Sequence, residues 1–112
     1  MSDSDRYRVP CGRHQFEFVI SRSRFIATAD RVPDIAATKS LLAEVRAAMP
    51  DANHHVYAFR VGHGNTVNEG MSDDGEPAGT AGPPVLAVVR GADIGDVMVI
   101  VTRYFGGTKL GT

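Results

Sequence analysis

Asp96-Val97-Met98-Val99-Ile100-Val101-Thr102-Arg103-Tyr104-Phe105 is the stretch that decides the fold, because it contains an unbroken apolar run, residues 97–101. Four of the five residues in that run are β-branched, and β-branched residues favour strands. A continuous apolar run, in contrast to an alternating one, is typical of a central strand that is covered on both faces. The stretch therefore predicts a buried strand at the centre of a sheet.

The residues at the N-terminal side predict a β-hairpin. In residues 15–20 the side chains of Phe16, Phe18 and Ile20 alternate with polar ones, which predicts a strand with these three side chains turned inward. Alternation resumes in residues 25–29 after a basic turn, so a second strand pairs with the first. A further strand is predicted over residues 55–61.

Two helices are predicted. Residues 33–49 carry apolar side chains at three- and four-residue steps before Pro50, which predicts a helix with its apolar stripe on the sheet. Residues 84–89 form a shorter apolar run that could be a buried strand or a helical turn, and a short helix is favoured because Pro83 and Pro84 fit its first turn and Gly91 fits its end. Thr80 could cap this short helix.

The span of residues 61–89, which leads into the short helix, predicts a long loop. It contains no Lys or Arg and half of the 12 glycines. Long loops in compact domains are usually functional or disordered. Four carboxylates fall in this span: Glu69, Asp73, Asp74 and Glu76.

Length and composition limit the class of protein. The 112 residues are enough for one domain, and 43% hydrophobic residues exclude a disordered or collagen-like chain. A net charge of −1 gives no overall basic excess for nucleic acid or an anionic membrane. The sequence has no secretory signal and no apolar run near the roughly 20 residues of a membrane helix, so a cytoplasmic location is expected. Cys11 is the single cysteine, which excludes a disulfide within these residues.

The acidic cluster has two interpretations. Asp73, Asp74 and Glu76 could hold Mg²⁺ or Ca²⁺, or form a carboxylate pair for acid–base chemistry. They could equally serve a tight turn, in which Asp caps the helix that follows. The spacing does not fit an EF-hand, and structural capping is favoured, so no metal and no cofactor are expected.

The adjacent histidines, His54 and His55, leave opposite faces if they begin a strand. They therefore cannot easily share one metal ion. One of them is expected to be hydrogen-bonded in the core and the other to lie at the surface, although a histidine beside an acidic loop could act as a general base.

The segment Arg103-Tyr104-Phe105-Gly106-Gly107-Thr108-Lys109 combines cations, aromatic rings and bare backbone. That combination suits RNA, where rings stack on bases and cations meet phosphates. The same residues could instead be core side chains at a strand end, with glycines for a sharp turn. The residues alone leave both interpretations open.

Four stretches together resemble the YigZ/IMPACT family. They are Ser23-Arg24-Phe25-Ile26-Ala27, residues 51–60 (Asp-Ala-Asn-His-His-Val-Tyr-Ala-Phe-Arg), residues 72–82 (Ser-Asp-Asp-Gly-Glu-Pro-Ala-Gly-Thr-Ala-Gly) and the Arg-Tyr-Phe-Gly-Gly-Thr-Lys-Leu-Gly segment of residues 103–111. The resemblance covers nearly all of the chain from Ser21 onward. It implies an α/β fold, specifically a two-layer RNase PH-like domain similar to domain IV of elongation factor G, with a left-handed βαβ crossover.

The resemblance also implies an extent and a role. Bacterial members continue into a further helix and a ferredoxin-like domain, so residues 1–112 are expected to be the N-terminal domain, cut before its last helix. The implied role is a non-enzymatic, translation-linked module whose partner is RNA, the ribosome or a translation factor. The candidate contact residues are Arg24, Arg103, Tyr104, Gly106, Gly107 and Lys109, beside a motif loop of His54, His55, Asp73, Asp74 and Glu76. The alternatives are a metal-assisted hydrolase of a phosphate-containing substrate and a pure protein-interaction scaffold.

Overall fold

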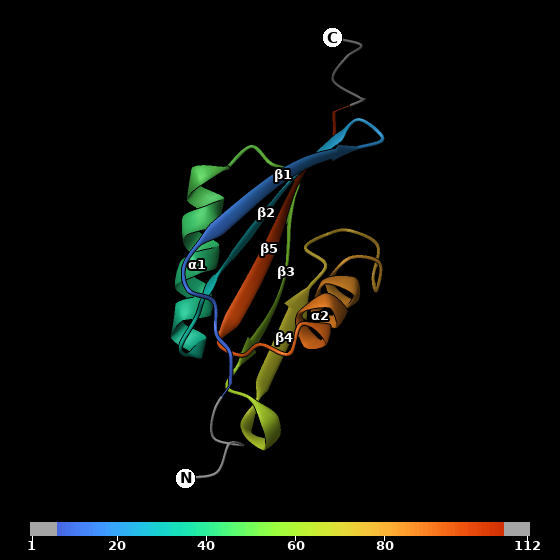
Figure 1. Ribbon diagram of the computed structural model, residues 1–112. Coiled ribbons are helices and arrows are strands. Elements are labelled where there is room, and N and C mark those ends of the chain that lie inside the picture. The colour runs from blue at the N-terminus through green and yellow to red at the C-terminus, as the bar shows by residue number, and fades with distance from the viewer. Residues whose placement is uncertain (1–6, 107–112) are drawn as a thin grey trace.

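The fold is one five-stranded antiparallel sheet with two α-helices (Figure 1). The computed structural model describes residues 7–106. The strands are β1 (His14–Ile20), β2 (Ser23–Arg31), β3 (His54–Val61), β4 (Asn68–Ser72) and β5 (Val97–Tyr104), and the helices are α1 (Ile35–Ala48), the short 3₁₀ helix η2 (Gly64–Thr66) and α2 (Gly82–Gly91). The spatial order is β1-β2-β5-β3-β4, which confirms that the apolar run forms the central strand. The mixed α/β class and the hairpin β1–β2 are likewise confirmed.

Helix α1 covers one face of the sheet and builds the main core. Its N-cap is Asp34, whose Oδ1 accepts a hydrogen bond from the Ala37 N–H at 2.8 Å. Leu41 and Val45 pack on Met98 and Ile100 of β5, and all four are buried. The predicted apolar stripe is therefore confirmed, and the core lies between α1 and the centre of the sheet.

Helix α2 lies on the other face. Residues directly paired across antiparallel strands share a face, so Val56 lies beside Val101, opposite Met98 and Ile100. Val56 and Ala58 of β3 are buried there, where α2 packs over β3 and β4. The chain thus has a helix on each face of the sheet. This makes three layers, whereas the family resemblance implied two.

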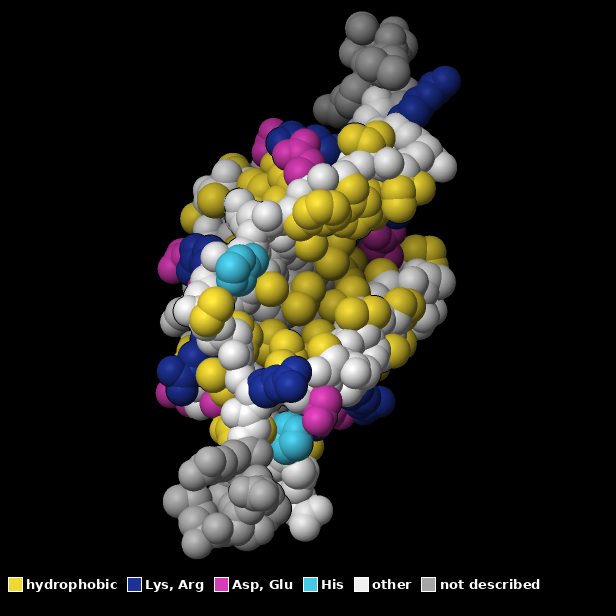
Figure 2. All heavy atoms as spheres, viewed as in Figure 1, with side chains coloured by type: hydrophobic (Ala, Val, Ile, Leu, Met, Phe, Trp, Pro, Cys, Tyr) yellow, Lys and Arg dark blue, Asp and Glu magenta, His cyan; other side chains and the backbone are white. Residues whose placement is uncertain are grey.

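The second face is only partly covered. Phe16 and Ile20 of β1 were predicted to point into the core, yet they are 68% and 57% exposed. Val99 and Val101 of β5 are half-buried, so the central strand is fully covered on the α1 face alone. Figure 2 shows hydrophobic side chains gathered around a hollow on this face. An apolar trough of about 200 Å³ lies on this face, lined by residues of all the strands except β4, by α2 and by the loop that precedes α2.

The predicted long loop contains structure that the sequence pattern missed. Strand β4 and helix η2 both lie within residues 61–89. Strand β4 reads Asn-Glu-Gly-Met-Ser, and an edge strand with few apolar residues gives almost no periodic signal. Gly70 is required there because a Cβ at this position would lie against the Phe59 ring of β3. No helix in the described part of the chain is long and apolar enough to span a membrane.

Candidate functional site

The family-motif residues meet at one end of the sheet. Strand register places His54 of β3 directly beside Arg103 of β5, and Arg103 directly beside Phe25 of β2. These three side chains form a row on the α2 face. The loop of residues 73–81 folds over the same row, and the site that results is called the motif end: Ser23, His54, Asp74, Glu76, Arg103 and Phe105.

Arg103 is the centre of the motif end. Its Nη1 donates to Glu76 Oε1 at 2.8 Å, and its Nε and Nη2 donate to Ser23 Oγ at 3.3 and 3.2 Å. The guanidinium lies over the rings of Phe25 and Phe105, with its carbon 5.4 and 4.5 Å from the two ring centroids. Planar cations are stabilised both by a paired carboxylate and by aromatic faces. The structure therefore shows Arg103 as a side chain held within its own chain.

His54 joins the loop to this row. Its Nδ1–H donates to the Asp74 carbonyl oxygen at 2.6 Å, and its Nε2 lies 4.0 Å from Glu76 Oε1. The Phe105 ring meets the imidazole edge-on, with ring centroids 5.4 Å apart. The nearly buried Glu76 therefore lies between His54 and Arg103, and Arg103 is its ion-pair partner.

Asp74 fixes the loop from its other side. Its Oδ2 accepts a hydrogen bond from the His55 backbone N–H at 2.7 Å, and its Oδ1 pairs with Arg46 of α1 at 3.3 Å. The residue has φ 45, in the left-handed region that non-glycine residues enter at a cost. Contacts to both β3 and α1 hold the loop in this conformation.

Asp73 caps helix α2 from nine residues upstream. Its Oδ1 accepts from the Ala81 and Gly82 N–H groups at 3.0 and 2.6 Å, and its Oδ2 accepts from the Gly79 N–H at 3.0 Å. The preference for structural capping over metal binding fits this arrangement. The expectation that Thr80 caps the helix is wrong, because its hydroxyl donates to the Pro77 carbonyl while Asp73 occupies the helix start.

Replacing Asp73 with Ala is expected to lower Tm by about 5 °C, since three backbone N–H groups lose their acceptor. Backbone donation from Gly79, Gly82 and Ala81 holds the pKa of the Asp73 carboxyl below its usual 3.8. A lowered carboxyl pKa stabilises the fold above pH 3.8, and this contribution is lost as pH falls through the folded-state value. Thermal unfolding between neutral pH and pH 3 tests both effects. An unchanged Tm in Asp73→Ala would contradict the capping role.

His55 lies on the opposite face, in the core, as the alternation of strand side chains predicted. Its Nε2–H donates to the Met49 carbonyl at 3.2 Å, and its Nδ1 lies 3.0 Å from the Thr102 hydroxyl oxygen. In the neutral imidazole Nδ1 accepts a hydrogen bond from that hydroxyl. Burial lowers the pKa of His55 below 6.5.

The free energy of unfolding is therefore expected to fall as the pH drops below about 6.5. In that range His55 binds a proton in the unfolded chain but stays neutral in the folded chain. The contribution is fully present above pH 6.5 and decreases down to the folded-state pKa. Urea unfolding of the wild type and of His55→Gln, between pH 5 and pH 8, isolates it as a difference. Equal pH slopes for the two proteins would refute this role of His55.

The carboxylates do not converge on one point. Among residues 7–106, no group of three or more His, Cys, Asp or Glu side chains is placed to hold a metal ion. Asp73 faces the start of α2, Asp74 faces β3 and α1, and Glu76 faces Arg103. The hydrolase alternative required these three to share an ion, and the observed geometry does not bring them together.

The other predicted contact residues are divided between the two faces. Arg24 and Tyr104 are direct cross-strand partners, with the guanidinium carbon 5.2 Å from the Tyr104 ring centroid, and they lie on the face opposite Arg103. Glu17 holds Arg24 at 2.6 Å. Gly106 packs against the β1–β2 turn, while Gly107 and Lys109 lie outside the described residues.

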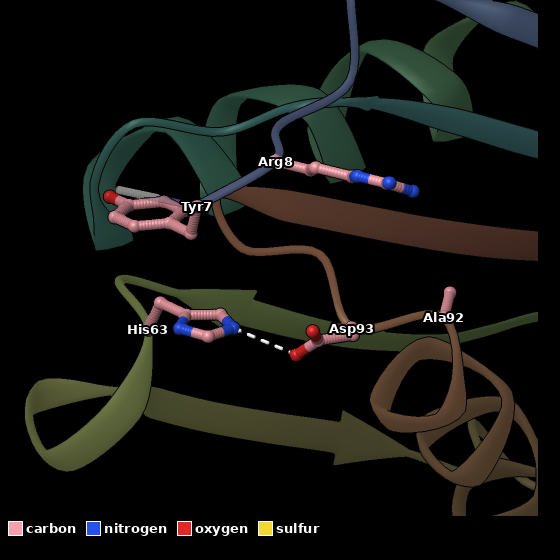
Figure 3. Close-up of a pocket in the computed structure, with 5 residues that line it drawn as sticks. All are labelled: Tyr7, Arg8, His63, Ala92 and Asp93. Carbon is pink, nitrogen blue, oxygen red and sulfur yellow. Dashed lines mark hydrogen bonds and ion pairs between the residues drawn. The ribbon is translucent and has the colours of Figure 1, made fainter. Parts of the chain in front are cut away.

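A polar cavity, separate from the apolar trough, lies at the other end of the sheet (Figure 3). It measures about 360 Å³ and is lined by Tyr7, Arg8, His63, Ala92 and Asp93. His63 Nε2 lies 2.9 Å from Asp93 Oδ1, and the Tyr7 ring stacks on the imidazole. Sequence reasoning did not find this cavity, nor the roles of Ser23 and Phe25. The alternating pattern of β2 and the family-like stretch of residues 23–27 both pointed to this segment, but neither assigned a role to Ser23 or Phe25.

Comparison with known proteins decides the family. The model of the Impact N-terminal domain matches residues 21–112. The chain belongs to this family. The IMPACT family member YigZ of Escherichia coli is 45% identical over 94 residues, which are 83% of this chain and 46% of that protein. An IMPACT family member of Haemophilus influenzae is 38% identical over 95% of this chain and 52% of its own length.

Two solved structures resemble this IMPACT-family domain. A crystal structure described as that of a hypothetical protein has a TM-score of 0.87 and 39% identity, covering 90% of this chain and 50% of the other. The two-domain translational regulator Yih1 has a TM-score of 0.68 and 27% identity, covering 96% of this chain and 42% of the other. The chain thus spans about half the length of the relatives it matches.

Proposed function

We propose that this chain is a translation-linked regulatory module that acts in the cytoplasm by binding a partner and not by catalysis. Membership of the IMPACT family and similarity to a structure titled as a translational regulator support the link to translation. The single observation that carries the binding role is the stack of Arg24 on Tyr104, in which Glu17 holds the guanidinium in place. Side chains committed to internal bonds form a preorganised surface, which favours recognition.

A protein partner fits the charges of the motif end better than RNA does. At this end of the sheet, on one face or the other, ion pairs join Arg24 to Glu17, Arg46 to Asp74 and Arg103 to Glu76. A phosphate backbone would have to compete with those carboxylates for each guanidinium. A protein surface of mixed charge meets such pairs without displacing them. Contact through Arg24 and Tyr104, which the cross-strand stack presents together, is therefore proposed with a protein of the translation machinery.

We further propose that the fold is RNase PH-like, as the resemblance to domain IV of elongation factor G implies. Strands β2 and β3 both run antiparallel to β5, so they are parallel to each other, with α1 connecting them. The left-handed crossover that the resemblance implies is proposed for this β2–α1–β3 connection. Residues 1–112 are proposed to be the N-terminal domain of a longer family member.

Sucrose-gradient co-sedimentation with ribosomes from the source cells tests the binding role. The chain is expected to migrate with ribosomal particles at both low and moderate salt, because a protein contact releases few counterions. Arg24→Ala is expected to lose this co-migration, whereas Arg90→Ala is expected to keep it. The two are matched, since Arg24 is 49% exposed and pairs with Glu17, and Arg90 is 57% exposed and pairs with Glu69.

Other outcomes have defined meanings. Co-migration that falls steeply with salt would replace the protein partner with RNA, and Lys109→Ala would then flatten the slope of log affinity against log salt by about one unit. Chain that stays at the top of the gradient under all conditions would overturn the proposed ribosome contact. Equal loss in Arg24→Ala and Arg90→Ala would overturn the assignment of the surface.

A further inference from the structure

Strand β1 is an edge strand without the features that normally protect an edge. The described residues place a neighbour, β2, on one side only. Six of the seven side chains of β1 are exposed, and Phe18 is the exception. The exposed ones include the apolar Phe16, Val19 and Ile20. The strand contains no proline, glycine or lysine, and its one acidic side chain, Glu17, is bound by Arg24. Such an edge is a template for another strand.

The opposite edge differs. Strand β4 has five residues against seven in β1, and it contains Gly70 and the charged Glu69. Glu69 is paired with both Arg60 and Arg90, at 2.9 and 2.6 Å. Both edge strands carry an ion-paired glutamate, so it is the short length of β4 that distinguishes the two edges, because short edge strands resist pairing with another strand. Strand addition is therefore expected at β1 and not at β4.

We propose that β1 pairs with β1 of a second copy of this chain, antiparallel and about a two-fold axis. About a two-fold axis, a residue that lies opposite a second residue in the other copy is matched by the reverse contact. The two residue numbers of every antiparallel pair therefore add to the same total. With Phe18 opposite Phe18 of the second copy, Phe16 meets Ile20 and Glu17 meets Val19. Shifting the register so that Phe16 meets Phe18 would place Glu17 opposite Glu17, and two like charges directly opposite are unfavourable.

This register continues the row of the motif end across the new seam. Phe18 stacks on Phe25 with ring centroids 5.1 Å apart and an interplanar angle of 9°, and Phe25 lies beside Arg103 and then His54. Phe18 opposite its own copy joins two such rows into one. Cross-strand aromatic pairs stabilise sheets, and this self-complementarity identifies a second copy as the occupant in preference to an unrelated strand.

Opposite charges at residue 19 test the pairing. Val19 is 65% exposed and would face Glu17 of the second copy twice in the dimer, once on each side of the axis. Val19→Glu is expected to raise the dimer dissociation constant by about tenfold or more. Val19→Lys removes the same apolar side chain and is expected to bind at least as tightly as the wild type. Val88 of α2 is 72% exposed, so Val88→Glu and Val88→Lys are controls expected to change nothing.

Sedimentation velocity across a concentration series gives the dissociation constant for each protein. The proposal requires a concentration-dependent dimer and opposite shifts for the two Val19 variants. A wild type that remains monomeric at millimolar concentration would overturn it. Identical effects of Val19→Glu and Val19→Lys would overturn this register. A dimer that Val85→Lys abolishes and Val19→Glu leaves intact would place the contact in the apolar trough and also overturn the proposal.

Discussion

Glu76→Ala is expected to lower the free energy of unfolding by about 1–3 kcal/mol, because it removes the carboxylate that neutralises the half-buried Arg103. The remaining guanidinium keeps its Ser23 and aromatic contacts but has no counter-charge in the motif end. Removing one member of a buried pair costs more than the pair itself contributes. Urea denaturation of the variant and the wild type measures the difference.

The double variant separates the pair from simple truncation. Arg103→Met with Glu76→Ala is expected to lose less stability than the two single changes added together, with a coupling of about 1–3 kcal/mol. Glu44→Ala is the matched control, because Glu44 also pairs with an arginine, Arg13, at 2.6 Å, but both side chains are exposed. Its effect is expected to stay within about 1 kcal/mol. Additive single changes at Glu76 and Arg103 would contradict the described motif end.

Gly106→Ala is expected to cost about 1–3 kcal/mol, because the new Cβ would lie against the backbone carbonyl oxygen of Arg22. The obstacle is backbone in the β1–β2 turn and not the end of a flexible side chain, so either the turn or the strand end must move. Both Ser21 and Arg22 have positive φ, at 50 and 70, which leaves the turn little freedom to adjust. Chemical denaturation checks the expected loss.

Gly91→Ala provides the control for this substitution. Gly91 is the last residue of α2, and a Cβ there meets nothing within 4 Å. Alanine stabilises helices relative to glycine, so Gly91→Ala is expected to be neutral or to stabilise by up to about 1 kcal/mol. Equal losses in the two glycine variants would mean that close approach at the turn is not the reason for Gly106. Gly106 was a candidate for partner contact, and its packing gives it a structural role as well.

The parts of the fold that local patterns determine were predictable. The β-branched run identified β5 as the central strand, and apolar spacing with Pro50 identified α1. The orientation of Phe16 and Ile20 was not predictable, because alternation shows that side chains share a face but not whether a helix covers that face. Helix α2 packs over β3 and β4 and leaves β1 uncovered.

The motif end required contacts between distant residues. Capping of α2 by Asp73 follows from a loop that folds back over nine residues, whereas local capping rules consider only neighbours such as Thr80. The division of Arg24 and Arg103 between two faces follows from the register of β2 against β5, which no single segment contains. The sequence pattern could group these residues by type but not by face.

The central claim is that the motif carboxylates hold a binding surface together and do not form a metal-dependent active site. Thermal unfolding of the chain with and without Mg²⁺, Mn²⁺ and Zn²⁺ tests this claim most directly. The same Tm is expected in every case. A ligand at a hundred times its dissociation constant would stabilise the fold by about 2.7 kcal/mol, which is readily measured. A saturable rise in Tm that disappears in both Asp73→Asn and Glu76→Gln would contradict the account.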